Sequence, residues 1–247
     1  MQGQIVRVKG KFNNSNLPKL SDFDTSALLR EILSHSACKA FYDLTDATKM
    51  TLSGGLILAV QDLKGGNDFV ATLAQAPTFN ASAFSGRGGA VFSGAQRMTA
   101  TGIFSGGDCS VLVSVQITEN YGNGIVFMPL NGTAGGNLYA STTGWKSFRG
   151  ALAYNAPSMY KRTLVSNIYR VDLKHKQIID ENILINASGG PAHLPVPASV
   201  LNIGATAVPD LFLKGIIGHI AVFNIDITSD QYLLNLLHEF HKRQYNI

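Results

Sequence analysis

The sequence predicts an all-β fold, a two-sheet antiparallel sandwich with a C-terminal amphipathic helix and a short N-terminal extension. Two properties of the whole chain support this prediction. Short apolar segments alternate with Gly-rich turns along most of its length, and 25 glycines among 247 residues suit many tight turns. Apolar residues make up 45% and charged residues 15%, so a large core can form and extensive disorder is not expected.

The C-terminal segment 215–247 gives the most detailed expectation. An apolar strand covers 215–224, a short turn follows, and a helix begins near Thr228. The Thr228 hydroxyl is a suitable N-cap, and Gln231 stands three residues later, as in a capping box. Ile227 and Tyr232 occupy the positions of a hydrophobic staple. One helical face then carries a continuous apolar stripe: Tyr232, Leu233, Leu236, Leu237 and Phe240.

Upstream of this helix the pattern indicates a series of short strands with turns between them. The expected strands are 56–62, 68–74, 89–93, 97–104, 109–118, 123–129, 136–141, 147–154, 163–172, 177–184, 199–204, 210–214 and 215–224. Residues 188–198 contain three prolines and are expected to form a surface loop. Because no linker or internal repeat interrupts this series, we expect a single sandwich domain over residues 38–247.

Residues 1–37 differ in organisation from the rest. Residues 5–12 predict one strand, and Asp24 or Thr25 is expected to cap a short helix whose apolar stripe needs a covering surface. We interpret 1–37 as an arm that docks onto other subunits or onto copies of itself. The alternative is that its strand is the first edge strand of the sandwich.

Residues 215–231 resemble the closing segment of the concanavalin A-like (laminin G-like) jelly-roll superfamily. Its pattern of Gly, alternating apolar residues, Phe-Asn, and Thr-x-Asp-Gln before a helix is met from Gly215 to Gln231. A second stretch, residues 40–79 followed by 89–98, is similar to the opening hairpins of lectin-like domains of phage and bacterial surface proteins. The resemblance implies a jelly-roll sandwich, whereas a function follows from it only weakly, because one fold hosts many functions.

Composition also narrows the classes of partner and compartment. The net charge is +4, but the basic residues occur as scattered pairs, so no nucleic-acid-binding stripe is expected. The longest apolar run is far too short for membrane insertion, and no targeting segment is evident, which favours assembly in the cytoplasm. Cys38 and Cys109 alternate with apolar residues, so we expect two free buried thiols rather than a disulfide.

The carboxylates argue against catalysis. Glucanases of this fold carry Glu and Asp at alternate positions of one strand, where they share a face. Glutamate occurs only at Glu31, Glu119, Glu181 and Glu239, and the adjacent pair Asp180-Glu181 points to opposite faces of a strand. We therefore expect a protein that is not an enzyme and has no catalytic residues. A hydrolase that assembles distant carboxylates stays the alternative.

No metal or other cofactor is expected. His238 and His241 lie three residues apart on the helix face opposite the apolar stripe. We expect their side chains to be solvated. The alternative is a metal site to which His219 also contributes, but the spacing is not that of a zinc motif. Calcium binding is the alternative, because many relatives of this fold hold a calcium ion near a sheet rim. Its candidate ligands also fit ordinary turn hydrogen bonds: Asp62, Asn67, Asp68 and Asp108.

Aromatic residues among polar turn residues are the candidate ligand-binding site. A sugar ring presents an apolar face to an aromatic side chain and hydroxyls to amide and guanidinium groups. The candidate glycan-binding residues are Trp145, Tyr121, Asn123, Asn131, Asn137 and Arg149. The alternative for Trp145, the only tryptophan, is core packing.

Together these observations favour a non-enzymatic structural or adhesion module of a phage virion, such as a tail, fibre or decoration protein for host attachment. This placement follows from the resemblance. The expected partners are other virion subunits or copies of the same chain, and cell-surface polysaccharide, with localisation in a virion assembled in the host cytoplasm. The alternatives are a polysaccharide-cleaving enzyme of the same fold and a structural subunit without affinity for glycans.

Overall fold

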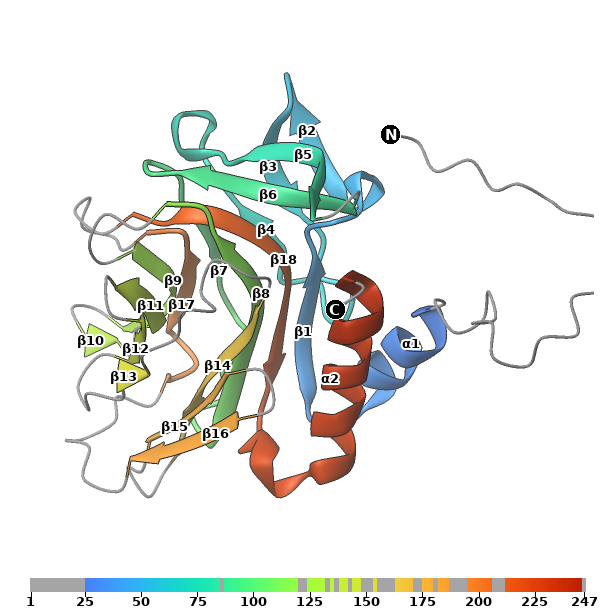
Figure 1. Ribbon diagram of the computed structural model, residues 1–247, viewed down its shortest axis with the longest axis vertical. Coiled ribbons are helices and arrows are strands. Elements are labelled where there is room, and N and C mark those ends of the chain that lie inside the picture. Colours follow the sequence, from blue (N-terminus) through green and yellow to red (C-terminus); the bar gives the residue numbers. More distant parts are fainter. Residues whose placement is uncertain are drawn as a thin grey trace, which may run out of the picture.

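The computed structural model describes residues 25–84, 87–119, 124–131, 134–135, 138–141, 144–147, 153–154, 163–170, 175–179, 182–186, 195–205 and 212–245. Within these residues every strand pairing is antiparallel, and the strands form one curled network that folds into two layers (Figure 1). The predicted all-β sandwich is confirmed.

The first layer is centred on the longest strand, β18. Its spatial order is β5 (Thr78–Phe84), β6 (Arg87–Ser93) with β1 (Cys38–Asp43), β18 (Lys214–Phe223), β8 (Cys109–Ile117), β14 (Thr163–Tyr169), β15 (His175–Ile179) and β16 (Asn182–Asn186). Strands β6 and β1 share one edge of β18, because β6 pairs with its first half and β1 with its second.

The second layer lies opposite. Its order is β2 (Met50–Ser53), β3 (Leu56–Val60), β4 (Phe69–Val70), β7 (Met98–Ala100), β17 (Val200–Ile203), β9 (Gly124–Asn131), β11 (Leu138–Ser141), β12 (Gly144–Ser147) and β13 (Ala153–Tyr154), with β10 (Ala134–Gly135) also on β9. A single pair, Leu56 with Thr78, joins β3 to β5 and makes the network continuous.

Two hydrophobic clusters follow from the alternation of strand residues. On β8, Val111, Val113 and Val115 face the second layer and belong to the core between the sheets, with Phe69 and Phe127 opposite. Leu112, between them, faces outward and belongs to a second cluster beneath the helices. Both faces of the first layer are therefore covered, which explains why β8 is apolar almost without interruption.

A bulge in β18 changes which residues face each cluster. The pairing with β8 shifts between Ile217 and His219, so Ile217 faces the inter-sheet core, whereas after the bulge Ile220 takes that face. The residue at the bulge is Gly218, where a Cβ would lie 2.1 Å from the Tyr245 hydroxyl. The bulge thus turns His219 toward the helices and lets Tyr245 approach the strand.

Helices α1 (Ser26–Ser34) and α2 (Gln231–Tyr245) cover the outer face of the first layer, beside β1 and β18 (Figure 1). Leu233, Leu236, Leu237 and Phe240 are at most 8% exposed, as the predicted stripe requires. Tyr232 is the exception at 60% exposure, so the predicted hydrophobic staple is wrong. Its ring turns outward, and its hydroxyl donates to the Glu31 carboxylate on α1.

The corner before α2 also differs from the expectation. Residues Ile227–Ser229 form a 3-10 turn, η5, in which the Asp226 carboxylate accepts from the Thr228 amide. The cap of α2 is Asp230, whose carboxylate accepts from the Leu233 amide at 2.9 Å. The predicted N-cap at Thr228 is therefore wrong by two residues, because the extra turn satisfies Thr228 before the helix begins.

Several expected strands have other boundaries. The expected strand 177–184 is a hairpin of β15 and β16, and the expected strand 97–104 is limited to β7. The expected strand 147–154 is replaced by β12 and β13, which pair with each other at Trp145 and Tyr154. Short strands separated by polar turn residues leave too little periodicity to place such boundaries.

Part of the 1–37 segment lies within the described residues. The predicted short helix is α1, although the Thr25 side chain makes no cap hydrogen bond. Ile32 is fully buried, and Leu28, Leu29 and Leu33 pack against the cluster beneath α2. The surface that covers the apolar stripe of α1 is thus the protein's own second helix and β1. Residues 1–24, with the expected strand 5–12, lie outside the described residues.

Both cysteines are free and buried, as expected, and they face different clusters. Cys38 lies beneath the helices and Cys109 in the inter-sheet core. Burial raises the pKa of the Cys38 thiol to about 12 and also raises the pKa of Cys109, so neither is a thiolate nucleophile at neutral pH. Among the described residues no helix is both long enough and apolar enough to cross a membrane.

Candidate functional site

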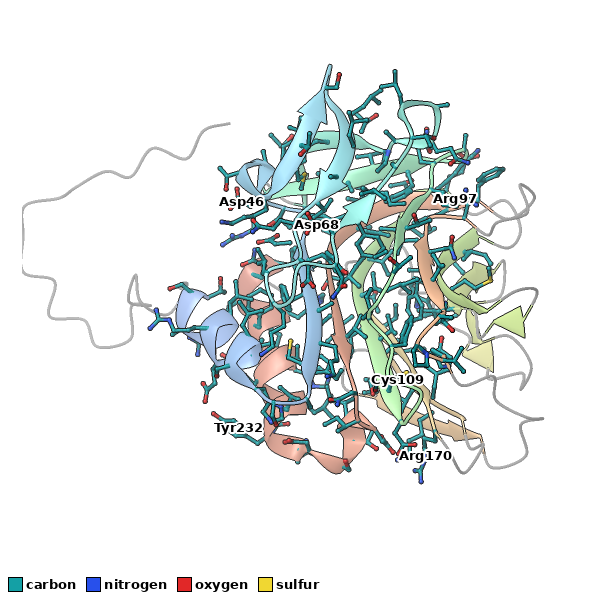
Figure 2. All side chains as sticks on the ribbon, turned by 180° about the vertical axis from the view of Figure 1, so that it is seen from behind. Asp46, Asp68, Arg97, Cys109, Arg170 and Tyr232 are labelled. Atoms are coloured by element: carbon teal, nitrogen blue, oxygen red, sulfur yellow. The ribbon has the colours of Figure 1, made fainter. Side chains whose placement is uncertain are left out.

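A groove of about 700 Å³, lined by both polar and apolar residues, opens where the two helices meet the rim of the first layer. Its walls come from the start of α1, the last turns of α2, the segment after β1, and strands β5 and β6. The lining residues are Thr25, Ser26, Leu29, Asp43, Thr45, Asp46, Ala47, Phe79, Ala81, Arg87, Gly88, Phe240 and Gln244. In Figure 2, Asp46 marks this rim, on the side of the molecule that carries the helices.

The segment after β1 forms two successive side-chain turns. Asp43 Oδ1 accepts from the Thr45 amide at 2.8 Å and from its hydroxyl at 2.6 Å. Asp46 repeats the arrangement with Thr48, at 2.9 Å and 2.8 Å, and begins the short 3-10 helix η2 (Ala47–Lys49). Aspartate followed two residues later by threonine favours such turns, because carboxylate oxygens readily accept from the backbone two residues ahead. Both carboxylates are therefore fixed at the groove.

Gln244 joins the three walls. Its side-chain oxygen accepts from the Thr25 hydroxyl at 2.9 Å, and its amide nitrogen donates to the Thr45 hydroxyl at 3.3 Å. The side chain is buried at 5% exposure. It therefore connects α2 with the start of α1 and with the rim after β1, and it holds the groove in shape.

The aromatic wall depends on a glycine. A Cβ at Gly88 on β6 would lie 2.6 Å from Cζ of Phe79 and 2.3 Å from the carbonyl oxygen of Thr45. Only glycine lets the Phe79 ring lie across β6 at this distance while the Thr45 backbone stays where it is. The ring remains partly exposed and lines the groove.

Charges of both signs surround the opening. Burial raises the pKa of the Asp43 carboxyl above its usual value, the hydrogen bonds from Thr45 oppose that rise, Asp46 adds to it, and Arg87 opposes it. Asp43 is thus within electrostatic range of both a second carboxylate and a guanidinium. Among the described residues, Asp43 Oδ2 and the guanidinium of the exposed Arg87 make no hydrogen bond. The groove therefore offers acceptors, donors and an aromatic face to a small polar ligand.

A buried polar cluster anchors α2 beside the groove. Ser114 Oγ on β8 lies 2.9 Å from His219 Nε2 and 2.6 Å from His241 Nδ1, and His219 Nδ1 lies 2.8 Å from the Tyr245 hydroxyl. His219 stacks on the rings of Phe41 and Tyr245. Burial, and then the facing imidazole of His241, lowers the pKa of His219 well below its usual value. This cluster is enclosed, so its role is to attach α2 to the sheet.

The candidate glycan-binding residues do not lie at the groove where their positions are described. Trp145 on β12 is fully buried in the inter-sheet core, which corresponds to the core alternative left open by the sequence. Its ring offers no surface to a ligand. Asn131 ends β9, and its side chain lies outside the described residues. The other four also lie outside them: Tyr121, Asn123, Asn137 and Arg149.

The considered metal ligands have structural partners. Asp62 accepts from the amides of Phe41, Lys64 and Asn67, and its own amide donates to Asp68 Oδ1, so these residues hold a turn. His241 was expected to be solvated, but it is 3% exposed and belongs to the buried cluster. In the part of the chain that the structure describes, no group of three metal-ligating side chains comes together.

The groove itself was missed by the sequence reasoning. None of its carboxylates was predicted as a site residue, and the candidate aromatic residues were expected in polar turns rather than on β5. The signal that was present is the repeated Asp-x-Thr spacing in residues 43–48, which marks fixed carboxylates directly after a strand. The contribution of α2 comes from residues distant in the sequence, and no local pattern predicts it.

Comparison with protein-family models and with curated protein sequences finds no match. Solved structures do match. A sialidase of Trypanosoma rangeli matches with a TM-score of 0.58 and 15% identity, over 85% of this chain and 33% of the sialidase chain. The sialidase in complex with sialic acid matches with a TM-score of 0.58 and 13% identity, over 85% and 34% of the two chains. This protein therefore spans about a third of the sialidase chains it matches.

A shorter protein matches over nearly its whole length. Domain 4 of AbnA, a GH43 extracellular arabinanase of Geobacillus stearothermophilus, was solved in complex with arabinotriose. It matches with a TM-score of 0.50 and 15% identity, over 81% of this chain and 97% of the domain. At these identities the likeness shows the fold alone. This chain has the β-sandwich fold of proteins that bind or act on carbohydrates.

These matches correct one expectation. The prediction of a protein that is not an enzyme is overturned, because the solved structures that share its fold include sialidases, which are enzymes. That prediction assumed that catalytic carboxylates occupy alternate positions of one strand. The groove instead brings Asp43, at the end of β1, close to Asp46, in the turn that follows. A pair of neighbouring carboxylates therefore exists that the strand pattern does not predict.

Proposed function

We propose that this protein binds carbohydrate and that the groove between α1, α2 and the rim of β1, β5 and β6 is its binding site. The observation that carries the proposal is the composition of that groove. An aromatic ring, fixed carboxylates and a guanidinium line it together, and these groups match the apolar face and the hydroxyls of a sugar. The shared fold with glycan-binding and glycan-active proteins supports the same class of ligand.

Each wall has a role in this proposal. Phe79 packs against the apolar face of a sugar ring. Asp43 Oδ2 accepts a hydrogen bond from a sugar hydroxyl, and the Arg87 guanidinium donates to a neighbouring oxygen. Gln244 is bonded to Thr25 and Thr45, so it acts by holding the walls in place.

Isothermal titration calorimetry with a panel of neutral oligosaccharides, including arabinotriose, tests the proposal. We expect binding by the full chain and a loss of about ten-fold or more for Phe79→Leu, which removes the aromatic face. Tyr232→Leu is the matched control, since it removes an exposed ring twelve residues from Gln244 on α2 and should leave affinity unchanged. Absence of binding across the panel, or equal losses in both variants, would refute the site.

The neighbouring carboxylates favour cleavage of glycosidic bonds as a second candidate function. In glycosidases one carboxyl group stays protonated to act as an acid while its neighbour is ionised. Asp43 has a raised pKa and Asp46 lies close to it. Release of reducing ends from polysaccharides, lost in both Asp43→Asn and Asp46→Asn but kept in Glu119→Gln, is the result this function requires. Binding without release leaves the protein a binding module.

The finer placement, an adhesion or structural module of a phage virion that contacts host-surface glycans, rests on the sequence resemblance. Its partners are then other virion subunits or further copies of this chain, and its location is the assembled particle. Co-purification of the protein with virions, detected by mass spectrometry of gradient-purified particles, tests this placement. Recovery only in the particle-free fraction would contradict it.

A further inference from the structure

The charges at the groove bear on which sugars it accepts. Asp43 and Asp46 contribute two carboxylates and Arg87 one guanidinium, so the ionised lining carries one negative charge more than it carries positive. Elsewhere the balance is reversed, since the whole chain has a net charge of +4. The negative groove is therefore a local property of this lining.

Hydrogen-bond capacity separates ligand classes further. A sugar hydroxyl both donates and accepts, so one hydroxyl can donate to Asp43 Oδ2 while it accepts from Arg87. An ionised sugar carboxylate only accepts. It can bind Arg87, but it then lies near two carboxylates to which it cannot donate, and repulsion between like charges opposes it.

We infer that the groove selects neutral, hydroxyl-rich sugars and rejects sugars that carry a carboxylate, with Asp46 as the residue that decides this selectivity. The inference rests on the proposed function. Arg87 offsets one of the two carboxylates, and the second determines the sign of the local charge. In this proposal Asp43 supplies the acceptor for a sugar hydroxyl, whereas Asp46, whose Oδ1 accepts from the Thr48 amide and hydroxyl, supplies the second negative charge.

Matched pairs of ligands test this selectivity. The probes are trisaccharides of glucose and of galactose, the corresponding glucuronate and galacturonate trisaccharides, and the methyl esters of these uronates. The esters restore neutrality on the same ring. We expect each neutral sugar and each ester to bind about ten-fold or more tightly than the free uronate in calorimetric titrations.

Variants assign the effect to one residue. Asp46→Asn keeps a side-chain oxygen for the Thr48 amide, so the turn is retained while the charge is removed. It should raise affinity for the uronates several-fold relative to the affinity for the neutral sugars. Glu119→Gln removes the same charge from a side chain outside the groove and should change neither.

The outcomes separate this inference from the proposed function. If no neutral sugar binds, the proposed function fails and the inference fails with it. If neutral sugars bind and uronates bind as tightly, the function stands and the selectivity is refuted. An unchanged ratio in Asp46→Asn would remove Asp46 from the explanation.

Discussion

At Ser114 a single hydroxyl serves two imidazoles. It lies within hydrogen-bond distance of His219 Nε2 and His241 Nδ1, and the Tyr245 hydroxyl completes the chain of contacts on His219. Because one hydroxyl can donate to one ring and accept from the other, these contacts are compatible with both rings being neutral. A proton added to either ring places a charge in an apolar enclosure.

This cluster predicts a loss of stability in mild acid. The pKa of His219 is lowered in the folded protein, so below about pH 6.5 the unfolded chain binds a proton that the folded chain excludes. The free energy of unfolding should therefore fall as the pH drops below that value, with a slope approaching about 1.4 kcal/mol per pH unit for one excluded proton. Urea denaturation at several pH values between 7.5 and 5 measures this slope.

The control is a pair of histidine substitutions. His219→Gln should flatten the pH dependence, while His35→Gln, at a partly exposed position on the surface, should leave it intact. The Asp226 carboxyl affects the free energy of unfolding in a lower pH range. Burial opposes its ionisation, but hydrogen bonds from Lys176 and Thr228 hold its pKa below the usual value, so its contribution is lost only in stronger acid. A slope that persists in His219→Gln would contradict the assignment.

Trp145 gives a second prediction at this scale. Its ring is fully buried in the inter-sheet core, and it is the only tryptophan, so its emission reports one environment. We expect blue-shifted fluorescence that acrylamide quenches poorly. Addition of a bound oligosaccharide should leave the emission unchanged, because the groove is built from other residues. A ligand-induced shift would return Trp145 to the list of binding residues.

Among the elements, α2 contributes to both stability and the groove. Its stripe packs on β1, β8 and β18, and burial of each large apolar side chain stabilises the fold by roughly 1.5–3 kcal/mol as an upper estimate. Its last turn contributes Gln244 to the groove and Tyr245 to the buried cluster. Loss of packing along this helix should therefore weaken the binding site as well as the fold.

Leu237→Ala tests the packing. Leu237 is 1% exposed, so its truncation should lower the free energy of unfolding by about 2–5 kcal/mol, the range for buried leucines. Leu73→Ala, at a position 64% exposed, is the matched control and should cost little. Chemical denaturation followed by circular dichroism measures both. Equal small losses would mean that α2 does not rest on the sheet in solution.

The sequence predicted α2 better than it predicted the groove, for a physical reason. A helical stripe is a local pattern, and Leu233, Leu236, Leu237 and Phe240 reveal it without knowledge of the partner surface. Thr228 and Asp230 are both residue types that favour an N-cap, so the sequence alone does not choose between them. The structure places the cap at Asp230, because Thr228 belongs to the 3-10 turn that Asp226 begins. The groove joins residues up to 219 positions apart, such as Thr25 and Gln244, which no local pattern links.

At the scale of the molecule, alternation and turn residues were sufficient to predict the sandwich, whereas the order of its strands was not predicted. Strand β18 shows why. Its pairing with β6, β1 and β8 depends on a bulge at Gly218 that exchanges its two faces, and alternation alone would place His219 and Ile220 on the wrong sides. The fold then brings the two ends of the described chain together, since α1 lies against α2.

This contact between the ends of the chain leads to a prediction about the segment 1–37, which was interpreted as a docking arm. Removal of residues 1–24 leaves every described contact in place, so the shortened chain should keep its unfolding free energy and its affinity for oligosaccharide. If the arm docks onto other copies of the chain, the same truncation should abolish self-association in sedimentation experiments. Self-association that persists unchanged would exclude residues 1–24 as the interface between copies.

Removal of residues 1–37 should act differently, because it deletes α1. Without Ile32 and its apolar neighbours, the cluster beneath α2 is exposed to solvent. Gln244 also loses its hydrogen bond from the Thr25 hydroxyl. We expect a clearly less stable protein that retains a β-type circular dichroism spectrum but binds oligosaccharide at least about ten-fold more weakly, since one wall of the groove is gone. Comparison of the two truncations thus separates a role in docking from a role in forming the groove. Equal behaviour of the two truncated chains would show that α1 contributes nothing to the groove, and that the domain begins, as the sequence suggested, after residue 37.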